Sequence, residues 1–200
     1  MGELSYQRTV TAYHGCDQFM LVEVLLRGKP LRASENPYDW LGRGIYFWEH
    51  GPQRALEWAA ETKVRKPCVL GAFLHLGNCF DLLDTAYTDV LRELFERYRR
   101  HCEQTGAVLP QNRPARGEAA NDLLLRYLDC AVVNWGLDYL EGDLGLRFHT
   151  VRCVFSEGQP AFPGSKIFAK SHIQIAVRDA SVIIGYFKPN LDLIVRRGLS

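Results

Sequence analysis

The segment Gly42-Arg43-Gly44-Ile45-Tyr46-Phe47 limits what this chain can fold into more than any other. Glycine lets the backbone come close to a neighbouring group, and the aromatic run that follows is typical of a short strand. The backbone of such a strand can pack closely against a flat ligand. The segment gains weight from two others, Tyr13-His14-Gly15 near the N-terminus and Ser171-His172-Ile173-Gln174-Ile175 near the C-terminus. We expect the three segments to form one cleft.

The spacing of apolar residues predicts strands alternating with helices in the first half of the chain. An apolar stripe at helical spacing runs from Gln18 to Arg27 and stops before Gly28, a common residue after a helix end. Pro52 suits the first turn of a second helix. The expected strands are 10–14, 44–47 and 68–76, the expected helices are 18–27 and 52–64, and turns fill 29–41 and 78–84.

The second half of the chain begins with helices and ends with strands. This order predicts an α+β fold with packed antiparallel sheets rather than a doubly wound parallel sheet. We expect one domain over residues 1–200, with a helical insertion at about 85–135. The expected helices are 85–104 and 118–134, the expected loop is 107–117, and the expected strands are 150–155, 173–177 and 181–187.

Composition narrows the class of protein. The formal net charge of +1 gives no electrostatic reason to expect binding to a nucleic-acid backbone. The six cysteines are scattered singly and the six histidines are dispersed, so we expect reduced thiols and no metal site. The first residues lack the apolar run of a secretory signal, and no segment stays apolar for the roughly 18 residues of a membrane span. We therefore expect a soluble cytoplasmic protein.

The three segments resemble the motifs of the ADP-ribosyltransferase superfamily, in its diphtheria-toxin and poly(ADP-ribose) polymerase branch. That branch has a strand histidine followed by glycine, a Gly-x-Tyr strand with a helix behind it, and a late strand that opens with glutamate. Tyr13-His14-Gly15 matches the first motif, and Gly44-Ile45-Tyr46-Phe47 with the helix at 55–59 matches the second. The third has the family spacing but carries Gln174 in place of the glutamate.

This resemblance implies a split β-sandwich of two small antiparallel sheets with flanking helices. It also implies NAD as co-substrate, no metal, and transfer of one ADP-ribose unit to a protein or nucleic-acid acceptor. Bacterial relatives of this kind often act as toxins or phage-defence effectors. Chain elongation to a polymer is not expected, because activating an incoming ribose hydroxyl relies on the carboxylate that Gln174 lacks.

The resemblance gives roles to the residues around the nicotinamide. His14 would anchor a ribose hydroxyl through a ring donor, and Gly15 would let its backbone contact the carboxamide. Tyr46 offers a face for stacking of the nicotinamide ring, worth roughly 1 kcal/mol beyond area burial, with Trp58 or Tyr38 as the opposite wall. The structural alternative is that His14 is a satisfied core histidine and that Tyr46 and Trp58 pack in the core.

The phosphates of a dinucleotide would need cationic side chains and a backbone segment that can approach them closely. Arg32 and Arg43 are the expected partners of the pyrophosphate, because a guanidinium group matches phosphate geometry, and Gly44 completes the expected binding residues. Each arginine is equally well explained as a solvated loop charge.

The turn-rich loop 157–166 leads into the last motif strand. In the family the corresponding loop contacts the acceptor, so Phe162 and Lys166 are expected acceptor contacts. The alternative is that this loop only connects two strands.

The glutamine at the third motif leaves the chemistry open. Departure of nicotinamide builds positive charge on the ribose, which a carboxylate stabilises and an amide does not neutralise. Three alternatives follow. Transfer needs no anion at Gln174, or the dinucleotide is bound without turnover. In the third, another carboxylate reaches the site, with Glu157, Glu49 and Asp17 as the candidates. His172 lies on the same strand face as Gln174 and is a further candidate for activating the nucleophile.

Two other functions share these residues. In an NAD glycohydrolase, water takes the place of the acceptor and free ADP-ribose is released. In a catalytically silent NAD or ADP-ribose binding module, no nicotinamide is released.

Overall fold

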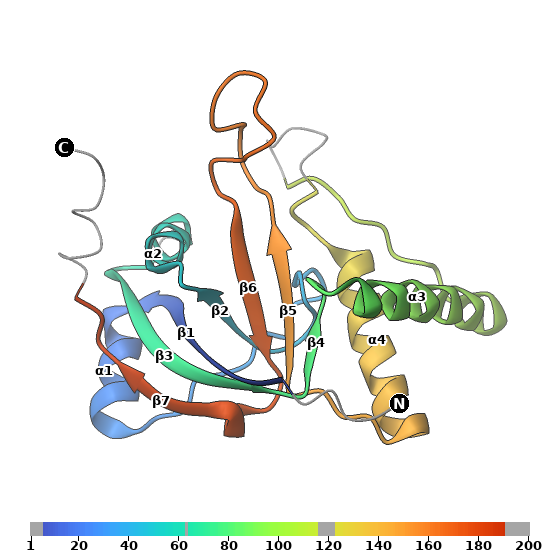
Figure 1. Ribbon diagram of the computed structural model, residues 1–200, viewed down its shortest axis with the longest axis horizontal. Coiled ribbons are helices and arrows are strands. Elements are labelled where there is room, and N and C mark those ends of the chain that lie inside the picture. Colours follow the sequence, from blue (N-terminus) through green and yellow to red (C-terminus); the bar gives the residue numbers. More distant parts are fainter. Residues whose placement is uncertain (1–5, 63, 116–122, 191–200) are drawn as a thin grey trace.

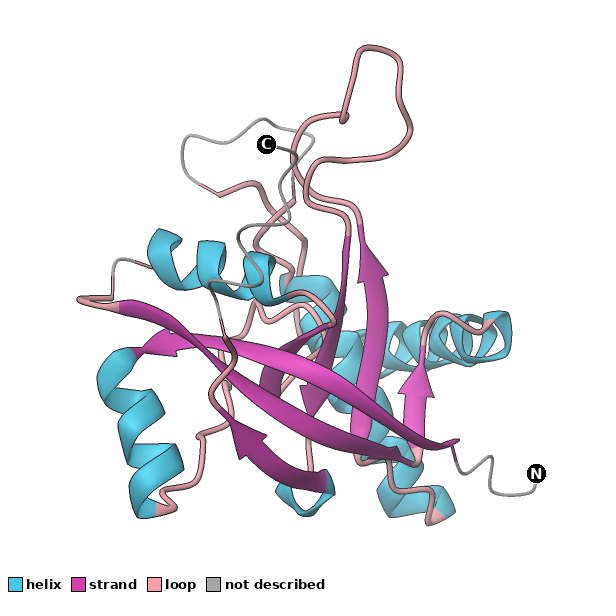
Figure 2. Ribbon diagram, turned by 60° about the vertical axis from the view of Figure 1, so that its left-hand side comes forward, coloured by secondary structure: helices cyan, strands magenta, loops and turns pink. Residues whose placement is uncertain are grey.

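The computed structural model describes residues 6–62, 64–115 and 123–190. Its strands form a seven-stranded sheet in the order β4-β5-β6-β2-β1-β3-β7, which Figures 1 and 2 show as a strongly twisted surface with helices around it. The strands are β1 (Tyr6–Asp17), β2 (Ile45–Glu49), β3 (Pro67–Gly77), β4 (Cys79–Asp81), β5 (Thr150–Phe155), β6 (His172–Val177) and β7 (Ile183–Phe187). The helices are α1 (Gln18–Arg27), α2 (Pro52–Glu61), α3 (Thr85–Thr105) and α4 (Tyr127–Leu144), with a 3-10 turn at Ala180–Val182.

The architecture is α+β, as predicted, but the described strands are not divided into two sheets. Strands β1 and β2 are paired at Ala12–Glu49 and Tyr13–Trp48, and this short contact joins the two halves. Strand β2 is only five residues long and is paired along its whole length with β6. All neighbouring strands are antiparallel except β4 and β5, which are parallel.

Local signals determine both ends of α1. The side chain of Asp17 accepts a hydrogen bond from the backbone N–H of Phe19 at 2.8 Å, which satisfies a free donor of the first turn. Gly28 then takes the left-handed conformation, with φ of 64°, which glycine adopts without steric cost. The predicted helix 18–27 is confirmed.

Helices cover the two faces of the sheet with separate cores. On one face, Leu21 and Val24 of α1 pack with Leu70 and Leu74 of β3. On the opposite face, α2 packs over β1 and β3 through a small cluster that contains Ala55 and Val69. Side chains of adjacent strand residues point to opposite faces, so β3 contributes to both cores. Helices α3 and α4 form a third layer beside β4 and β5 (Figure 1).

Helix α4 differs from its prediction. The expected helix was 118–134, whereas α4 runs from Tyr127 to Leu144, and residues 116–122 lie outside the described residues. Asn112 lies beside the start of α4, where its side-chain oxygen accepts a hydrogen bond from the backbone N–H of Leu128 at 2.8 Å. The cap therefore comes from a residue well upstream in the sequence. The helical insertion accordingly extends to Leu144 rather than to about 135.

Smaller differences concern the sheet. Strand β1 covers Tyr6–Asp17 rather than 10–14. The expected turn 78–84 contains the three-residue strand β4, and the last strand begins at Ile183 after the 3-10 turn rather than at Ser181. All six cysteines have free thiols. In the parts of the chain that the structure describes, no helix is both long and apolar enough to cross a membrane.

Candidate functional site

A cavity of about 540 Å³ lies where β1, β2 and β6 meet one side of α2 and the loop before β2. His14, Tyr46 and Gln174 all line it. Each comes from a different motif segment, and the segments lie on β1, β2 and β6. The structure therefore brings the three predicted catalytic positions to one site.

His14 bridges the two halves of the sheet just beyond the last β1–β2 pair. Its Nδ1 lies 2.8 Å from the carbonyl oxygen of Tyr46, and a carbonyl can only accept, so Nδ1 carries the proton. Burial lowers the pKa of His14 below its usual value, which favours the neutral ring. The remaining nitrogen, Nε2, is then an acceptor, so the expected ring donor toward a ribose hydroxyl is replaced by an acceptor.

Tyr46 uses its hydroxyl group to hold the loop before β2. The hydroxyl donates to the carbonyl oxygen of Gly42 at 2.6 Å and accepts from the backbone N–H of Leu41 at 2.8 Å. Burial raises the pKa of Tyr46 far above its usual value, so the phenol stays protonated. The aromatic ring lines the cavity.

Further aromatic side chains line the same cavity. Trp58 of α2 and Tyr38 of the loop, the two alternatives for an opposite wall, are both present, with exposed fractions of 38% and 37%. Sequence reasoning missed Trp48, which is buried beneath Trp58 with 5.5 Å between ring centroids. It follows Tyr46 by two residues, which places both on one face of β2.

Gln174 and His172 form a hydrogen-bonded pair on β6. The Nδ1 of His172 lies 2.6 Å from the carbonyl oxygen of Lys170 and therefore carries the ring proton. The Nε2 of His172 then accepts from the Nε2 of Gln174, at 3.1 Å. Burial lowers the pKa of His172, in keeping with this neutral form. Gln174 lines the cavity, with its amide orientation set by His172.

A nearly buried ion pair lies in the cavity wall. Arg54 of α2 donates from Nη2 to both carboxylate oxygens of Glu157, at 3.0 and 3.1 Å, and the two side chains are 10% and 11% exposed. Both line the cavity with Gln174. Glu157 was one of three expected substitute carboxylates. Arg54 was missed, although its spacing of four residues from Trp58 places the two on one helix face.

The other two substitute carboxylates do not line the cavity. Glu49 follows Trp48 on β2 and points to the opposite face, where it forms a buried ion pair with Arg152. Asp17 caps α1 and also accepts from the backbone N–H of Lys66. Of the three carboxylates, the geometry leaves Glu157 for the site.

The two predicted phosphate-binding arginines have different positions. Arg32 lines the cavity and is exposed, and it has no ion-pair or hydrogen-bond partner among the residues that the structure describes. Arg43 does not line the cavity, because both ends of its guanidinium group pair with Asp138 of α4 at 2.9 and 2.5 Å. The hydrogen bonds to Asp138 raise the pKa of Arg43. Arg43 is therefore placed outside the cavity that His14, Tyr46 and Gln174 line.

The two predicted glycines also differ. Gly44 lines the cavity and pairs with Ser34 in the preceding loop. Gly15 lies beneath α2, where an added Cβ would be only 2.1 Å from the carbonyl oxygen of Ala55. Gly15 is not among the residues that line the cavity. Its observed role is the close approach of α2 to β1.

The loop between β5 and β6 extends away from the sheet as a hairpin (Figure 1). The backbone N–H of Ala161 donates to the carbonyl oxygen of Ile167 at 2.8 Å. The backbone N–H of Ala169 donates to the carbonyl oxygen of Gln159 at 2.9 Å. Phe162 is 61% exposed and Lys166 is exposed, and neither lines the cavity. Both are therefore placed outside the cavity, on a projecting loop.

Within residues 6–62, 64–115 and 123–190, no group of three or more side chains is arranged to hold a metal ion. Comparison with known proteins gives no match, whether to a protein-family model, to a curated protein or to a solved structure. The geometry of the cavity is therefore the basis for a functional assignment.

Proposed function

We propose that the chain is an NAD-dependent mono-ADP-ribosyltransferase, which cleaves the nicotinamide glycosidic bond and transfers ADP-ribose to a macromolecular acceptor. The observation that supports this most is the common cavity of His14, Tyr46 and Gln174. These residues lie far apart in the sequence, and each belongs to a different one of the three motif segments. A volume of about 540 Å³ also falls in the usual range for small-molecule sites.

The aromatic residues fit a flat ring. In the proposed complex the nicotinamide stacks on Tyr46, with Trp58 or Tyr38 on its other side. The Nε2 of His14 accepts a hydrogen bond from a ribose hydroxyl, because Nδ1 already donates to the backbone. Arg32 pairs with the pyrophosphate, since it lines the cavity without a competing carboxylate among the described residues.

Glu157 supplies the cavity with a carboxylate, which Gln174 does not provide. As the glycosidic bond breaks, positive charge develops on the ribose and is stabilised by nearby anions and dipoles. Glu157 lines the same cavity, and its pair with Arg54 fixes its position. Gln174 orients the ribose hydroxyl through its amide. The acceptor itself then provides the nucleophile, which gives a single transfer rather than a polymer.

The test is incubation of the protein with NAD labelled in its adenosine part, with and without cell lysate. We expect nicotinamide release and labelled macromolecules. Tyr46→Ala and Glu157→Gln should each lower transfer at least about tenfold. Arg32→Gln should raise the KM for NAD, whereas Arg43→Gln is the matched control outside the cavity and should leave it unchanged.

The same experiment separates the alternatives. Free ADP-ribose without labelled macromolecules would replace the transferase by a glycohydrolase. Saturable NAD binding without nicotinamide release would indicate a silent binding module. Absence of NAD binding, or equal activity of Tyr46→Ala and the unaltered protein, would contradict the proposal.

A further inference from the structure

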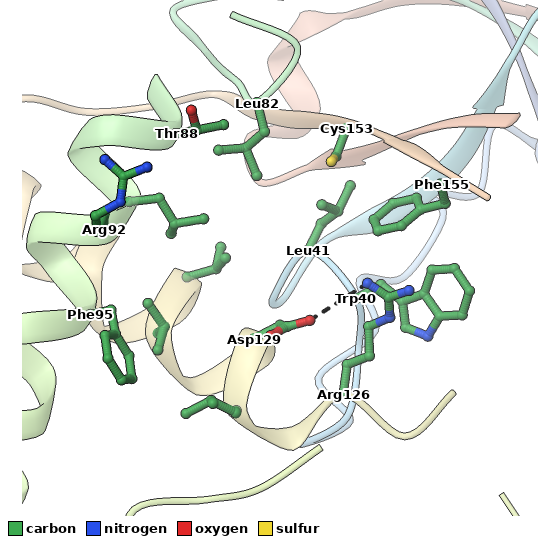
Figure 3. A pocket seen from close by; sticks show the side chains of 14 residues that line it. Trp40, Leu41, Leu82, Thr88, Arg92, Phe95, Arg126, Asp129, Cys153 and Phe155 are labelled. Atoms are coloured by element: carbon green, nitrogen blue, oxygen red, sulfur yellow. Dashed lines mark ion pairs between the residues drawn. The ribbon is translucent and has the colours of Figure 1, made fainter. Parts of the chain in front are cut away.

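A second cavity lies between helices α3 and α4 and strand β5, in the part of the chain for which the proposed function gives no role. Its volume is about 420 Å³. Figure 3 shows apolar side chains around it, with Arg126 and Trp40 on one side and Phe95 and Arg92 on the other. Leu41 and Val133 contribute buried walls. The body of a ligand in this cavity would have to be apolar.

Arg126 gives the cavity one cationic end. Its guanidinium carbon lies 4.1 Å from the centroid of the Trp40 ring and 4.8 Å from that of Phe155. Two aromatic faces thus hold the group in a fixed plane, as in cation–π contacts generally. The side chain is only 26% exposed, so most of it is removed from solvent.

The hydrogen-bond donors of Arg126 are largely unused. A guanidinium group carries five N–H donors, yet this one makes no hydrogen bond to the residues that the structure describes, and its Nε is buried without a partner. Arg126 forms an ion pair with Asp129, which also lines the cavity (Figure 3), but Oδ2 of Asp129 is 3.5 Å from Nη1, which is long for a hydrogen bond. Oδ1 of Asp129 accepts from Asn112 at 2.8 Å instead.

We propose that this cavity binds a small organic acid that has an apolar body and a single carboxylate group. The carboxylate would take the unused donors of Arg126, because the planar guanidinium group matches a carboxylate in a two-bond arrangement. The apolar body would lie along the walls from α3 and α4. This proposal does not rest on the NAD chemistry, because the two cavities share only Trp40 among the described residues that line them.

The test is calorimetric titration of the full chain with octanoate and, separately, with the neutral analogue 1-octanol. We expect saturable one-site binding of octanoate to the unaltered protein. Arg126→Gln should weaken octanoate binding roughly tenfold or more, the scale of a lost charge-assisted hydrogen bond. The same change should leave the affinity for 1-octanol within about twofold, since the apolar contacts remain.

Two further variants test the position of the ligand. Val132→Trp should abolish binding of both probes, because Val132 lines the cavity and a larger side chain fills it. Arg92→Gln is the matched control, because Arg92 also lines the cavity but already donates a hydrogen bond to Asp89 at 2.7 Å. It should leave octanoate affinity within about twofold.

The proposal is overturned if the unaltered protein shows no saturable octanoate binding, or if Arg126→Gln binds octanoate as tightly as the unaltered protein does. Melting temperatures establish that each variant is folded. If Arg126→Gln does not fold, the decision rests on the unaltered protein. There, tighter binding of octanoate than of 1-octanol, decreasing with added salt, supports the proposal, and equal affinities overturn it.

Discussion

The Nε2 of Gln174 donates to the Nε2 of His172 across 3.1 Å, so the histidine determines which way the amide faces. The imidazole can accept because its other nitrogen donates to the carbonyl oxygen of Lys170. The pair works only while His172 is neutral, since an imidazolium has no acceptor. The orientation of the Gln174 amide is therefore linked to the protonation state of its neighbour.

The change Gln174→Glu should raise the pKa of His172. A carboxylate next to Nε2 favours the charged imidazolium, which the present amide disfavours. An NMR titration of the His172 ring checks this, with Gln174→Leu as the control that introduces no charge. A pKa that is unchanged in Gln174→Glu would show that the two side chains do not interact in solution.

Gly15→Ala should destabilise the fold. The new Cβ would lie 2.1 Å from the Ala55 carbonyl oxygen, which is backbone and cannot move without displacing α2. Overpacking of this kind typically costs about 1–3 kcal/mol. Gly142→Ala is the control, because an added Cβ there has nothing within 4 Å, and a helical alanine should stabilise by about 0.5–1 kcal/mol. Urea unfolding measures both, and losses of similar size would contradict the packing role of Gly15.

Arg152→Met should be among the most destabilising single changes. Arg152 is 5% exposed and bridges Glu49 and Asp81, which are 3% and 6% exposed. Breaking a buried ion pair by removing one partner costs about 3–5 kcal/mol, because the other charges remain buried. Arg92→Met removes an exposed ion pair with Asp89 and should cost less than about 1 kcal/mol. Denaturant midpoints distinguish the two, and the triple change of Arg152, Glu49 and Asp81 to apolar residues should recover stability.

Acid should weaken the fold in the titration range of histidine. Burial lowers the pKa of both His14 and His172 below 6.5, so the unfolded chain binds these protons first as the pH falls. The free energy of unfolding should therefore be fully retained above about pH 7 and should decrease as the pH falls through 6.5 toward the lower folded values. His14→Asn should flatten this decrease, and an unchanged slope in unfolding measurements between pH 7 and 5 would contradict the assignment.

Short-range signals in the sequence predicted helix α1 and most strands well. Asp17 and Gly28 lie directly beside α1, so both caps could be found in the sequence. The start of α4 could not be found in this way, because its capping side chain, Asn112, is distant in the sequence and is not part of the helix. The three-residue β4 is too short to show a period.

In the site, too, residues with a local sequence motif were predicted, whereas contacts between distant residues were not. His14, Tyr46 and Gln174 were predicted from motifs, and they share a cavity. Arg43 was expected there because of its charge, but Asp138, from a helix far along the chain, pairs with it elsewhere. Arg54 was missed because its partner in the cavity wall, Glu157, is distant in the sequence. Charge identifies a candidate partner, whereas only the fold decides which partner is near.

The short contact between β1 and β2 raises the question of what holds the two sides of the cavity together. His14 lies on β1, in the half of the sheet formed by β1, β3 and β7. Tyr46 and Gln174 lie on β2 and β6, in the other half. Buried residues of both halves belong to one hydrophobic core, in which Phe47 and Ile175 pack with Ala12 and Leu74, so more than the two strand pairs holds the halves together. The imidazole of His14 adds a hydrogen bond between the halves, to the carbonyl oxygen of Tyr46, and this bond fixes the ring at the cavity wall.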